Sequence, residues 1–326
     1  MRFGVLGATS VVATDAVLPA IVTSGGARLV HVASRDAAAA SAVATRYEAE
    51  RSSGRYEAVL ADPDVEAVYV PLPNGLHREW TERAAAAGKH VLCEKPLATS
   101  AAEAAAMAGA CEAAGVLLME AYMTPFHPRA PAVLDLVGAG VLGEARLARA
   151  DFTFPLVDSA NHRWEPAMGG GALLDLGVYC LTPLIDAGGG PPAAVEARAV
   201  AAPSGVDATF TGWLAFPGGF TAAFACSFEA PERQWLQIVG TEATVTVDMP
   251  FAGGATGTRA LVHHRDGRVE PVDGPDGDPY LGMVDHFAAA VRGRTAPRRT
   301  PGDSIALLAL MDRLRAAASA SAAAGG

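Results

Sequence analysis

Short apolar segments alternate with longer amphipathic or alanine-rich segments over the first 121 residues. β-Branched and apolar residues fill 2–7, 28–34 and 65–70, and Gly, Ser or Pro stands at or directly after the end of each run. Such runs predict buried strands. Two further strands are predicted at 89–95 and 116–122, and helices at 16–24, 36–50, 75–88 and 100–114. Strands that alternate with helices predict βαβ units, and therefore an α/β Rossmann domain with a doubly wound parallel sheet over 1–121.

The pattern changes after residue 121, where strand-like segments follow one another between Gly, Pro and Asn/Asp. We expect strands at 152–156, 208–216, 219–228, 234–240 and 243–249, and helices at 131–138, 172–187, 280–292 and 303–318. This order predicts a C-terminal α+β domain over 122–326 with a mainly antiparallel open sheet. The Gly- and Ala-rich tail, 316–326, is expected to fray.

The length and the charge narrow the class of protein. A chain of 326 residues suits two domains. The net charge of −10 argues against nucleic acid as the main partner, because such proteins carry basic patches. We expect no membrane span, because no apolar run approaches about 18 residues without Gly, Pro or a charge. We also expect no metal site and a cytoplasmic protein, because the four cysteines are far apart and no signal peptide precedes them; they are Cys93, Cys111, Cys180 and Cys226.

The first predicted strand ends in a glycine turn. In a dinucleotide-binding fold, backbone N–H groups at this turn and at the helix start hold the pyrophosphate. Of the G-x-G-x-x-G fingerprint, Gly7 remains, while Thr9 and Val12 occupy the other two glycine positions. The alternative is an ordinary strand-to-helix turn of another α/β protein. We expect the pyrophosphate to contact Gly7, Ala8, Thr9, Ser10 and Val11.

The end of the second predicted strand bears on the choice of cofactor. A carboxylate usually stands there in NAD-dependent enzymes and binds the ribose hydroxyls. This chain has Ser34 and Arg35 first, and a guanidinium pairs well with a 2′-phosphate. We therefore expect NADP(H) to be preferred, with NAD(H) as an alternative. A solvent-exposed Arg35 paired with Asp36 is the structural alternative.

Two segments carry residues suited to carbonyl reduction. Lys95 follows a predicted parallel strand, at the sheet edge where ligands bind. Asp175 and Tyr179 are four residues apart in a predicted helix and therefore share one face. A cationic Lys lowers the pKa of a nearby Tyr, which then exchanges a proton with a substrate oxygen.

The chain resembles the glucose–fructose oxidoreductase/inositol dehydrogenase (Gfo/Idh/MocA) family over nearly its whole length. The matching segments are GVLGATS, VYVPLPNGLH, GKHVLCEKPLAT, MEAYM and MGGGALLDLGVYCL. Many members have His where this chain has Tyr179. The Tyr form is similar to the branch with dimeric dihydrodiol dehydrogenase, NADP-dependent xylose dehydrogenase and sugar 3-ketoreductase.

The resemblance implies a role for each matching residue. Lys95 would be the catalytic lysine, Tyr179 the acid/base, and Asp175 the group that orients the lysine or the substrate. Thr9 departs from the family, where many relatives have Gly or Ala. The implied cofactor contacts are Pro71, Leu72, Asn74, His77, Glu94, Lys95, Arg163 and Trp164, and the implied substrate contacts are Lys95, His162 and Tyr179.

These observations predict an NADP-dependent dehydrogenase or reductase that acts on CH–OH groups of a sugar or polyol. The nicotinamide would lie between the domains, over Lys95 and Tyr179. One alternative is a ketoreductase for a nucleotide-activated deoxysugar, and a second is a regulatory protein that binds dinucleotide without turnover.

Large apolar residues in 208–228 predict a homodimer or homotetramer. We expect them on both faces of the sheet, so that some of them meet a partner chain. They are Phe210, Trp213, Phe216, Phe220, Phe224 and Phe228.

Overall fold

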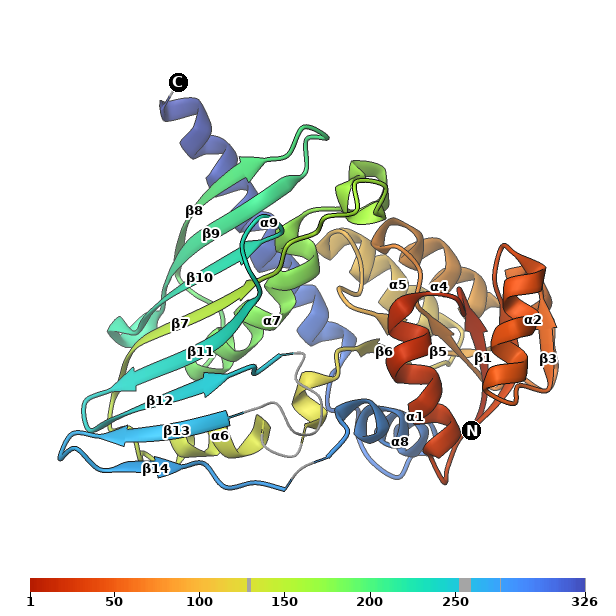
Figure 1. Cartoon of the computed structure of the whole chain (residues 1–326), viewed down its shortest axis with the longest axis horizontal. Coiled ribbons are helices and arrows are strands. Elements are labelled where there is room, and N and C mark those ends of the chain that lie inside the picture. Colours follow the sequence, from red (N-terminus) through yellow and green to blue (C-terminus); the bar gives the residue numbers. More distant parts are fainter. Residues whose placement is uncertain (128–129, 252–258, 276, 326) are drawn as a thin grey trace. The chain divides into compact units, whose positions relative to one another are not determined.

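The chain separates into two compact units in a computed structural model that describes residues 1–127, 130–251, 259–275 and 277–325 (Figure 1). The first unit consists of Met1–Met123 and Tyr280–Ile305. The second consists of Thr124–Pro279 and Ala306–Gly326.

A six-stranded parallel sheet forms the centre of the first unit, as predicted. Its strand order is β3-β2-β1-β4-β5-β6, so the order reverses between β1 and β4. In doubly wound folds, ligands bind outside the carboxyl ends of the strands at such a reversal. The strands are β1 (Arg2–Leu6), β2 (Arg28–Ala33), β3 (Arg51–Ser53), β4 (Ala67–Val70), β5 (His90–Glu94) and β6 (Leu118–Ala121).

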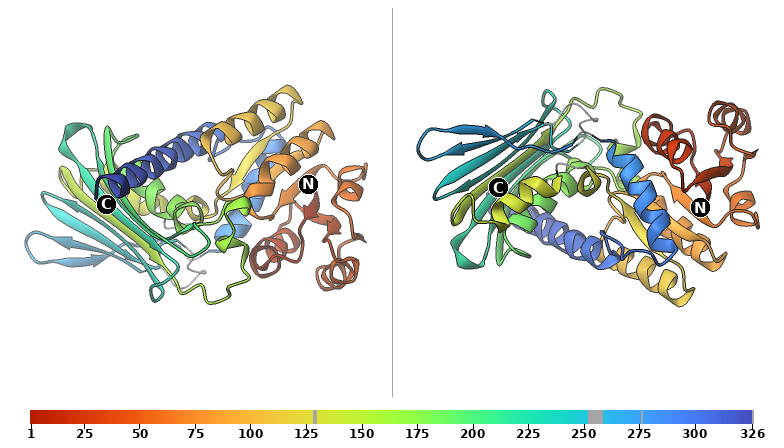
Figure 2. Two further views of the ribbon diagram at one scale, coloured as in Figure 1. Left: turned by 90° about the horizontal axis from the view of Figure 1, so that it is seen from above. Right: turned by 90° about the horizontal axis from the view of Figure 1, so that it is seen from below.

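Helices cover both faces of this parallel sheet. On one face, α1 and α8 lie together: Ser24 donates a hydrogen bond to Asp285, and the Phe287 ring lies 5.8 Å from that of Phe3. Helices α4 and α5 lie on the other face (Figure 2). The helices are α1 (Leu18–Thr23, after a π-helical turn at Ala13–Val17), α2 (Ala37–Arg46), α3 (Tyr56–Leu60), α4 (His77–Ala86), α5 (Ala101–Ala113) and α8 (Pro279–Val291).

The segment Tyr280–Ile305 differs from the expected domain division. The sequence interpretation assigns it to the second domain, whereas its contacts place it in the first unit. Two kinds of contact hold it there: the Phe287 ring of α8 packs on Phe3 of β1, and Arg299 Nε lies 2.8 Å from Glu120 Oε2 on β6. Ser304 adds a 2.7 Å hydrogen bond to the same oxygen.

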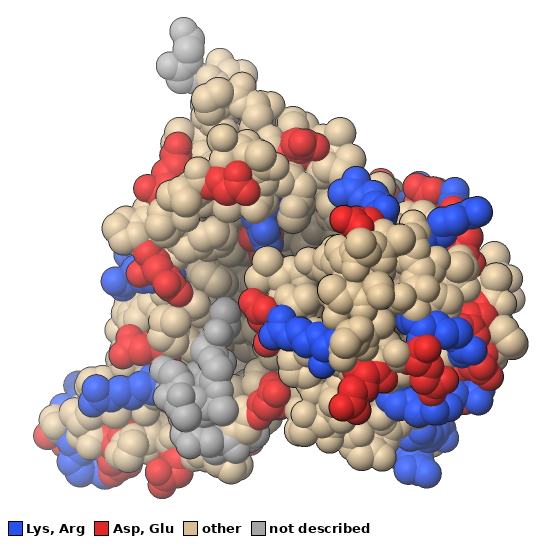
Figure 3. Space-filling model, turned by 45° about the vertical axis from the view of Figure 1, so that its right-hand side comes forward, with Lys and Arg blue, Asp and Glu red and all other residues tan. Residues whose placement is uncertain are grey.

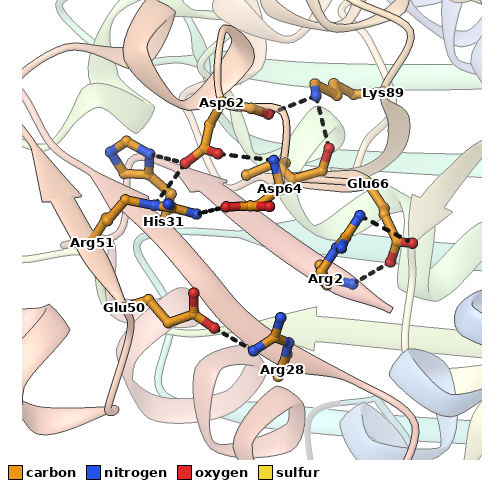
Figure 4. Close-up of polar contacts among 10 residues, drawn as sticks. Arg2, Arg28, His31, Glu50, Arg51, Asp62, Asp64, Glu66 and Lys89 are labelled. Carbon is orange, nitrogen blue, oxygen red and sulfur yellow. Dashed lines mark hydrogen bonds and ion pairs between the residues drawn. The ribbon is translucent and has the colours of Figure 1, made fainter.

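A polar network closes the edge of the sheet opposite to the carboxyl ends (Figure 4). Asp62 lies 2.9 Å from both His31 Nδ1 and Arg51 Nε. Lys89 Nζ donates to the backbone carbonyls of Asp62 and Val65, at 2.8 and 2.7 Å. Burial raises the pKa of Asp62, but hydrogen bonds from Asp64 N–H and His31 and the charge of Arg51 outweigh it, so that the pKa is below its ordinary value. The network therefore satisfies the polar groups of the turn that leads into β4.

The second unit contains an open eight-stranded sheet of order β14-β13-β12-β11-β7-β10-β9-β8. Its neighbouring strands are antiparallel except for the parallel pair β7 and β10. The predicted, mainly antiparallel sheet is therefore confirmed. Its strands are β7 (Ala145–Thr153), β8 (Ala194–Ala201), β9 (Asp207–Ala215), β10 (Thr221–Ser227), β11 (Arg233–Gly240), β12 (Ala243–Asp248), β13 (Arg259–His264) and β14 (Val269–Pro271).

Helix α7 (Ala172–Ala187) is the core helix of the second unit and has the predicted bounds. It packs against β7, β9 and β10, and α9 (Pro301–Gly325) lies on the same side of the sheet (Figure 2).

The stretch Pro166–Ala187 is long and apolar enough to cross a membrane by length and composition, but 78% of its most apolar window is buried in the fold. Helix α9 continues to Gly325, so the expectation of a frayed tail is wrong for the described residues. The remaining helix is α6 (Ala130–Gly138).

The five phenylalanines in and beside β9 and β10 lie on one face of the sheet and Trp213 lies on the other, so the expected division between the faces is wrong for the phenylalanines. Residues two apart in a strand point to the same side, and the five phenylalanines all stand at even positions. Each of them is at most 6% exposed and packs inside this chain. Trp213 stands on the other phase and is 61% exposed. The buried residues are Phe210, Phe216, Phe220, Phe224 and Phe228.

Charged side chains of both signs are interspersed over the face drawn in Figure 3. Blue Lys and Arg side chains neighbour red Asp and Glu side chains there, and no continuous basic patch covers this face. This agrees with the net charge of −10.

Candidate functional site

The glycine turn after β1 lies against the segment that follows β4. Gly7 has a φ of +93°, and a Cβ there would lie 2.7 Å from Leu72 Cδ2 and 3.2 Å from the Pro71 carbonyl oxygen. Glycine is therefore required by both backbone conformation and space. The N–H groups of Gly7 and Ala8 both donate to the carbonyl of Ala33, at 2.9 Å.

These two hydrogen bonds hold the end of β2, and the pyrophosphate contacts expected of Gly7 and Ala8 stay a prediction. Thr9 and Val11, which follow, are exposed. The Ser10 hydroxyl accepts a 3.3 Å hydrogen bond from the N–H of Ala13 and so supports the helix start.

Strand β2 is followed by Ser34 and Arg35, and the next residue, Asp36, caps helix α2. Ser34 is buried, and its hydroxyl lies 3.2 Å from that of Thr9. Arg35 is exposed. Asp36 caps α2, because its Oδ1 accepts from the N–H groups of Ala38 and Ala39 at 2.8 and 3.1 Å. This edge thus offers a guanidinium at the place where NAD-dependent enzymes usually have a carboxylate.

His77 joins the loops that follow β4 and β5. Its ring is fully buried, with Nε2 2.7 Å from the Leu72 carbonyl oxygen and Nδ1 3.0 Å from that of Pro96. A ring enclosed in this way supports the two loops, and the cofactor contact expected of His77 stays a prediction. Pro71 and Leu72 are buried in the same segment, and Asn74 is half-buried at its end.

The backbone around Lys95 is held by side chains on three sides. The Lys95 N–H donates to Glu94 Oε2 at 3.2 Å, and the Leu97 N–H donates to Glu120 Oε1 at 2.8 Å. The carbonyl between them, of Pro96, is the one that His77 contacts. The Lys95–Pro96 peptide bond is cis, and Lys95 is half-buried. The segment is therefore fixed at the carboxyl end of β5.

Glu94 is a buried carboxyl group whose pKa lies above the ordinary value for a glutamate. Tyr69 donates a 2.6 Å hydrogen bond to its Oε1. Burial raises the pKa of Glu94 to about 7, against the opposing effects of the Tyr69 hydrogen bond and the Lys95 charge. The group next to Lys95 thus changes its charge near neutral pH.

The three glycines before α7 are needed by the chain's own packing. A Cβ on Gly170 would lie 2.4 Å from the Arg163 carbonyl oxygen, and one on Gly171 would lie 2.3 Å from Asp207 Oδ1. Gly169 and Gly171 also have φ values of +69° and +111°. The run therefore brings Arg163 and Asp207 against the start of α7.

Asp207, the first residue of β9, caps α7 from a different element. Gly171 at the N-cap has no side chain, and the Leu173 N–H donates to Asp207 Oδ2 at 2.7 Å. Burial raises the pKa of Asp207 to about 6, although the hydrogen bond from Leu173 opposes this.

Asp175 and Tyr179 both lie buried on α7, one turn apart. Arg163 Nε donates to Asp175 Oδ2 at 2.8 Å, so a guanidinium from the preceding loop pairs with this carboxylate. His162 and Trp164 flank Arg163 in a 3-10 turn and are half-exposed. The structure therefore brings Arg163 and Asp175 together within the second unit.

A chain of aromatic rings runs from Tyr179 to Trp164. Tyr179 lies 5.3 Å from Phe152 between ring centroids, and Phe152 lies 6.4 Å from Phe154. Phe228 continues the chain, 5.4 Å from both Phe154 and Trp164. The sheet side of α7 thus presents aromatic surface beside the predicted acid/base.

The sequence interpretation did not identify several residues of these sites. Glu120 could have been identified, because a carboxylate inside the apolar run LLMEAY needs a buried partner. Asp207, Tyr69 and Arg299 could not, because their contacts join segments far apart in the chain. Lys95 belongs to the first unit and Tyr179 to the second, and their joint action stays a prediction.

Comparison with known proteins gives matches along the chain. Residues 1–122 match an oxidoreductase family model with an NAD-binding Rossmann fold, and residues 132–246 match a GFO/IDH/MocA C-terminal domain. A D-xylose 1-dehydrogenase (NADP(+)) from Haloferax volcanii is 37% identical over 99% of both chains.

Two solved structures are similar over almost their full length. An aldose-aldose oxidoreductase from Caulobacter crescentus, complexed with glycerol, has a TM-score of 0.91 at 28% identity and covers 98% of both chains. A 3-ketoreductase from Actinomadura kijaniata, in complex with NADP and TDP-benzene, has a TM-score of 0.89 at 33% identity and covers 97% of both chains.

Proposed function

Because the chain belongs to the GFO/IDH/MocA oxidoreductase family, we propose that it transfers hydride between NADP(H) and a carbon that bears a hydroxyl or carbonyl group in a sugar or polyol. The observation that carries this proposal is the placement of Lys95. It stands at the carboxyl end of β5, on a segment fixed by Glu94, His77 and Glu120. Such an edge binds the ligands of doubly wound folds.

Tyr179 is the acid/base of the proposed reaction. When the substrate is an alcohol, its oxygen gives a proton to Tyr179 as hydride leaves the carbon, and reduction runs in the opposite direction. Lys95 supplies positive charge that stabilises the tyrosinate. The ion pair of Asp175 with Arg163 holds the loop before α7 against the helix face that carries Tyr179. The dinucleotide supplies the hydride chemistry when bound, and the chain supplies position and charge.

Several residues are suited to hold the cofactor. Arg35 is exposed and available to pair with a 2′-phosphate, whereas the Asp36 carboxylate caps α2. Thr9 and Val11 are exposed at the helix start, where a pyrophosphate would bind. The same preference follows from the relatives whose names include NADP.

A ketoreductase for nucleotide-linked deoxysugars is the second candidate function, because the similar 3-ketoreductase structure contains TDP-benzene. Two contacts favour an uncharged substrate instead. Asp207 already caps the amino end of α7, which in other proteins serves as an anion site. The guanidinium of Arg163 pairs with the Asp175 carboxylate, which offsets the positive charge that a diphosphate would need.

The open face of the second unit's sheet supports a homodimer, with the homotetramer as the larger alternative. Trp213, Leu147 and Val200 are 61%, 51% and 58% exposed on the outward phase of β9, β7 and β8. These side chains stand on the same face of the sheet, and an exposed tryptophan on an open sheet face favours an interface there. We further propose that the enzyme acts in the cytoplasm, in keeping with its four free, buried cysteines.

A substrate screen tests the proposed function. Purified protein is incubated with NADP+ and aldoses, polyols or trans-dihydrodiols, or with NADPH and a dTDP-linked keto-deoxysugar, and the absorbance of reduced nicotinamide is followed. Turnover of an uncharged sugar or polyol supports the proposal, and turnover of the dTDP-sugar alone supports the second candidate. Tight NADPH binding without turnover of any compound would instead indicate a regulatory protein.

A further inference from the structure

Glu120 has one hydrogen bond directed toward the Lys95 segment and two directed away from it. Its Oε1 accepts from the Leu97 N–H at 2.8 Å. Its Oε2 accepts from Arg299 Nε at 2.8 Å and from Ser304 at 2.7 Å. We propose that Glu120, held by Arg299 and Ser304, is a positioning residue that sets the place of Lys95 and so the rate of hydride transfer. This inference rests on the proposed function, because Lys95 must be catalytic for its placement to matter.

The position of Glu120 in the sheet suits this task. Strand β6 pairs in parallel with β5, with Glu120 opposite Cys93 and Ala121 opposite Glu94. Glu120 therefore stands beside Cys93, two residues before Lys95. It is 1% exposed, and Arg299 is 7% exposed with its guanidinium 5.3 Å from the centre of the Tyr122 ring.

Burying the Glu120–Arg299 ion pair costs more desolvation free energy than a hydrogen bond to one backbone N–H requires. The Leu97 N–H needs an acceptor, and a neutral side-chain oxygen would serve at a lower desolvation cost. An ionised carboxylate fixed by a guanidinium and a hydroxyl makes shorter and stronger hydrogen bonds with a narrower geometry. The arrangement therefore fixes the position of the Leu97 backbone, two residues from Lys95, more narrowly than a neutral acceptor would. Displacement of a reacting group by about 1 Å can cost about 10²-fold in rate.

The first unit contains a matched control for the chemistry of this pair. Asp62 is also a buried carboxylate that accepts from a backbone N–H, that of Asp64, and pairs with an arginine, Arg51. It lies in the network at the opposite edge of the parallel sheet (Figure 4). Replacement of either carboxylate by its amide removes one charge from a buried carboxylate that pairs with an arginine; the Arg51 side chain is 41% exposed and that of Arg299 is 9% exposed. Of the two carboxylates, Glu120 alone contacts the Lys95 segment.

The experiment compares Glu120→Gln and Asp62→Asn in the full chain, with the best substrate of the screen. We expect Glu120→Gln to lower kcat by about 10–100-fold, with KM for NADP(H) changed less than threefold. Asp62→Asn should also lower the melting temperature but leave kcat within twofold of the wild type. Equal losses of kcat in both variants, or an unchanged kcat in Glu120→Gln, would overturn the proposal.

Hydrogen–deuterium exchange gives a readout that does not depend on activity. Peptides that cover 94–98 should exchange faster in Glu120→Gln, and those of β1 and β4 should not. Unchanged protection of 94–98 contradicts the proposed contact. If Glu120→Gln fails to fold, Ser304→Ala decides: it removes one donor from Oε2 and should lower kcat two- to fivefold with KM for NADP(H) unchanged, and an unchanged kcat overturns the proposal.

Lys95→Met separates this inference from the proposed function. If Lys95→Met retains activity, the proposed function is wrong at Lys95. If Lys95→Met is inactive and Glu120→Gln keeps the wild-type kcat, the role of Glu120 alone is wrong.

Discussion

The carboxylate of Asp207 caps the helix that carries Tyr179, and it does so from the beginning of strand β9. The Leu173 N–H donates to Asp207 Oδ2 at 2.7 Å, while Gly171 at the N-cap provides backbone alone. The position of the proposed acid/base thus depends on a residue 28 positions further along the chain, from 179 to 207.

Asp207→Ala should destabilise the protein by about 1–2 kcal/mol, the usual effect of losing a helix cap. It should also lower kcat, because the first turn of α7 carries Asp175. Urea unfolding and steady-state kinetics check both effects. Asp207→Asn is the matched control, because its amide oxygen still accepts from Leu173; if it is as damaging as Asp207→Ala, capping is not the cause.

Lys95→Met and Tyr179→Phe should each lower the rate by roughly 10²–10⁴, the range for a lost acid/base or its supporting charge. The double variant should lose much less than the product of the two single losses, because the residues act as one unit. Single-turnover kinetics with NADP(H) measures the chemical step. Tyr179→Phe with wild-type kcat and kcat/KM would remove Tyr179 from the mechanism.

Arg35→Ala should raise the KM for NADP(H) about tenfold or more, because a hydrogen-bonded charge pair with the 2′-phosphate is lost. The KM for NAD(H) should stay nearly constant, since NAD has no such phosphate. Steady-state kinetics with both cofactors provides the test. Equal losses with both would argue against the assignment of Arg35.

Glu94 should make stability depend on pH near neutrality. Burial raises its pKa in the folded chain to about 7, above the unfolded value, so the folded state binds this proton more tightly. Its contribution to stability is complete below the unfolded pKa and is lost as the pH rises through about 7. The free energy of unfolding of the wild type should therefore fall relative to that of Glu94→Gln between pH 5 and pH 8, as measured by urea titration. A constant difference over this range would contradict the raised pKa.

Trp213→Glu combined with Leu147→Glu should produce a folded monomer, because both side chains stand on the outward face of the second unit's sheet. Sedimentation velocity measures the mass, and circular dichroism checks the fold. Val157→Glu is the control, because Val157 is 89% exposed in a loop outside the sheet and should leave the assembly intact. A wild-type mass of one chain at every concentration would reject the dimer.

Much of the fold follows from the sequence, because strands buried on both faces form continuous apolar runs. The predicted helix at 172–187 agrees with α7 at both ends, since a glycine run precedes it and Gly188 follows it. Strands β3, β8, β13 and β14 were missed, and the strand expected at 152–156 overlaps β7 only at residues 152 and 153. Of these, β3, β8 and β14 lie at sheet edges, where exposed polar residues hide the apolar pattern.

Fewer residues of the candidate site than elements of the fold could be predicted from the sequence. Lys95 and the Asp175–Tyr179 pair were predicted because Lys95 follows a strand and the other two residues share a helical face, and their joint role stays a prediction. Glu120 and Arg299 are 179 residues apart, and spacing along a chain does not indicate such a pair. The glycines before α7 were noticed, but their reason, the approach of Arg163 and Asp207, depends on tertiary packing.

The return of Tyr280–Ile305 to the first unit has a consequence for synthesis on the ribosome. At roughly 5–20 residues per second, the 179 residues between Glu120 and Arg299 take about 10–35 s to emerge. During that interval the carboxylate of the nascent chain lacks its guanidinium, while strands β7 to β14 of the later unit are already out of the exit tunnel. We therefore expect the amino-terminal unit to close only after the sheet of the second unit has emerged, and a fragment that ends at residue 123 to bind dinucleotide poorly although it contains the whole parallel sheet.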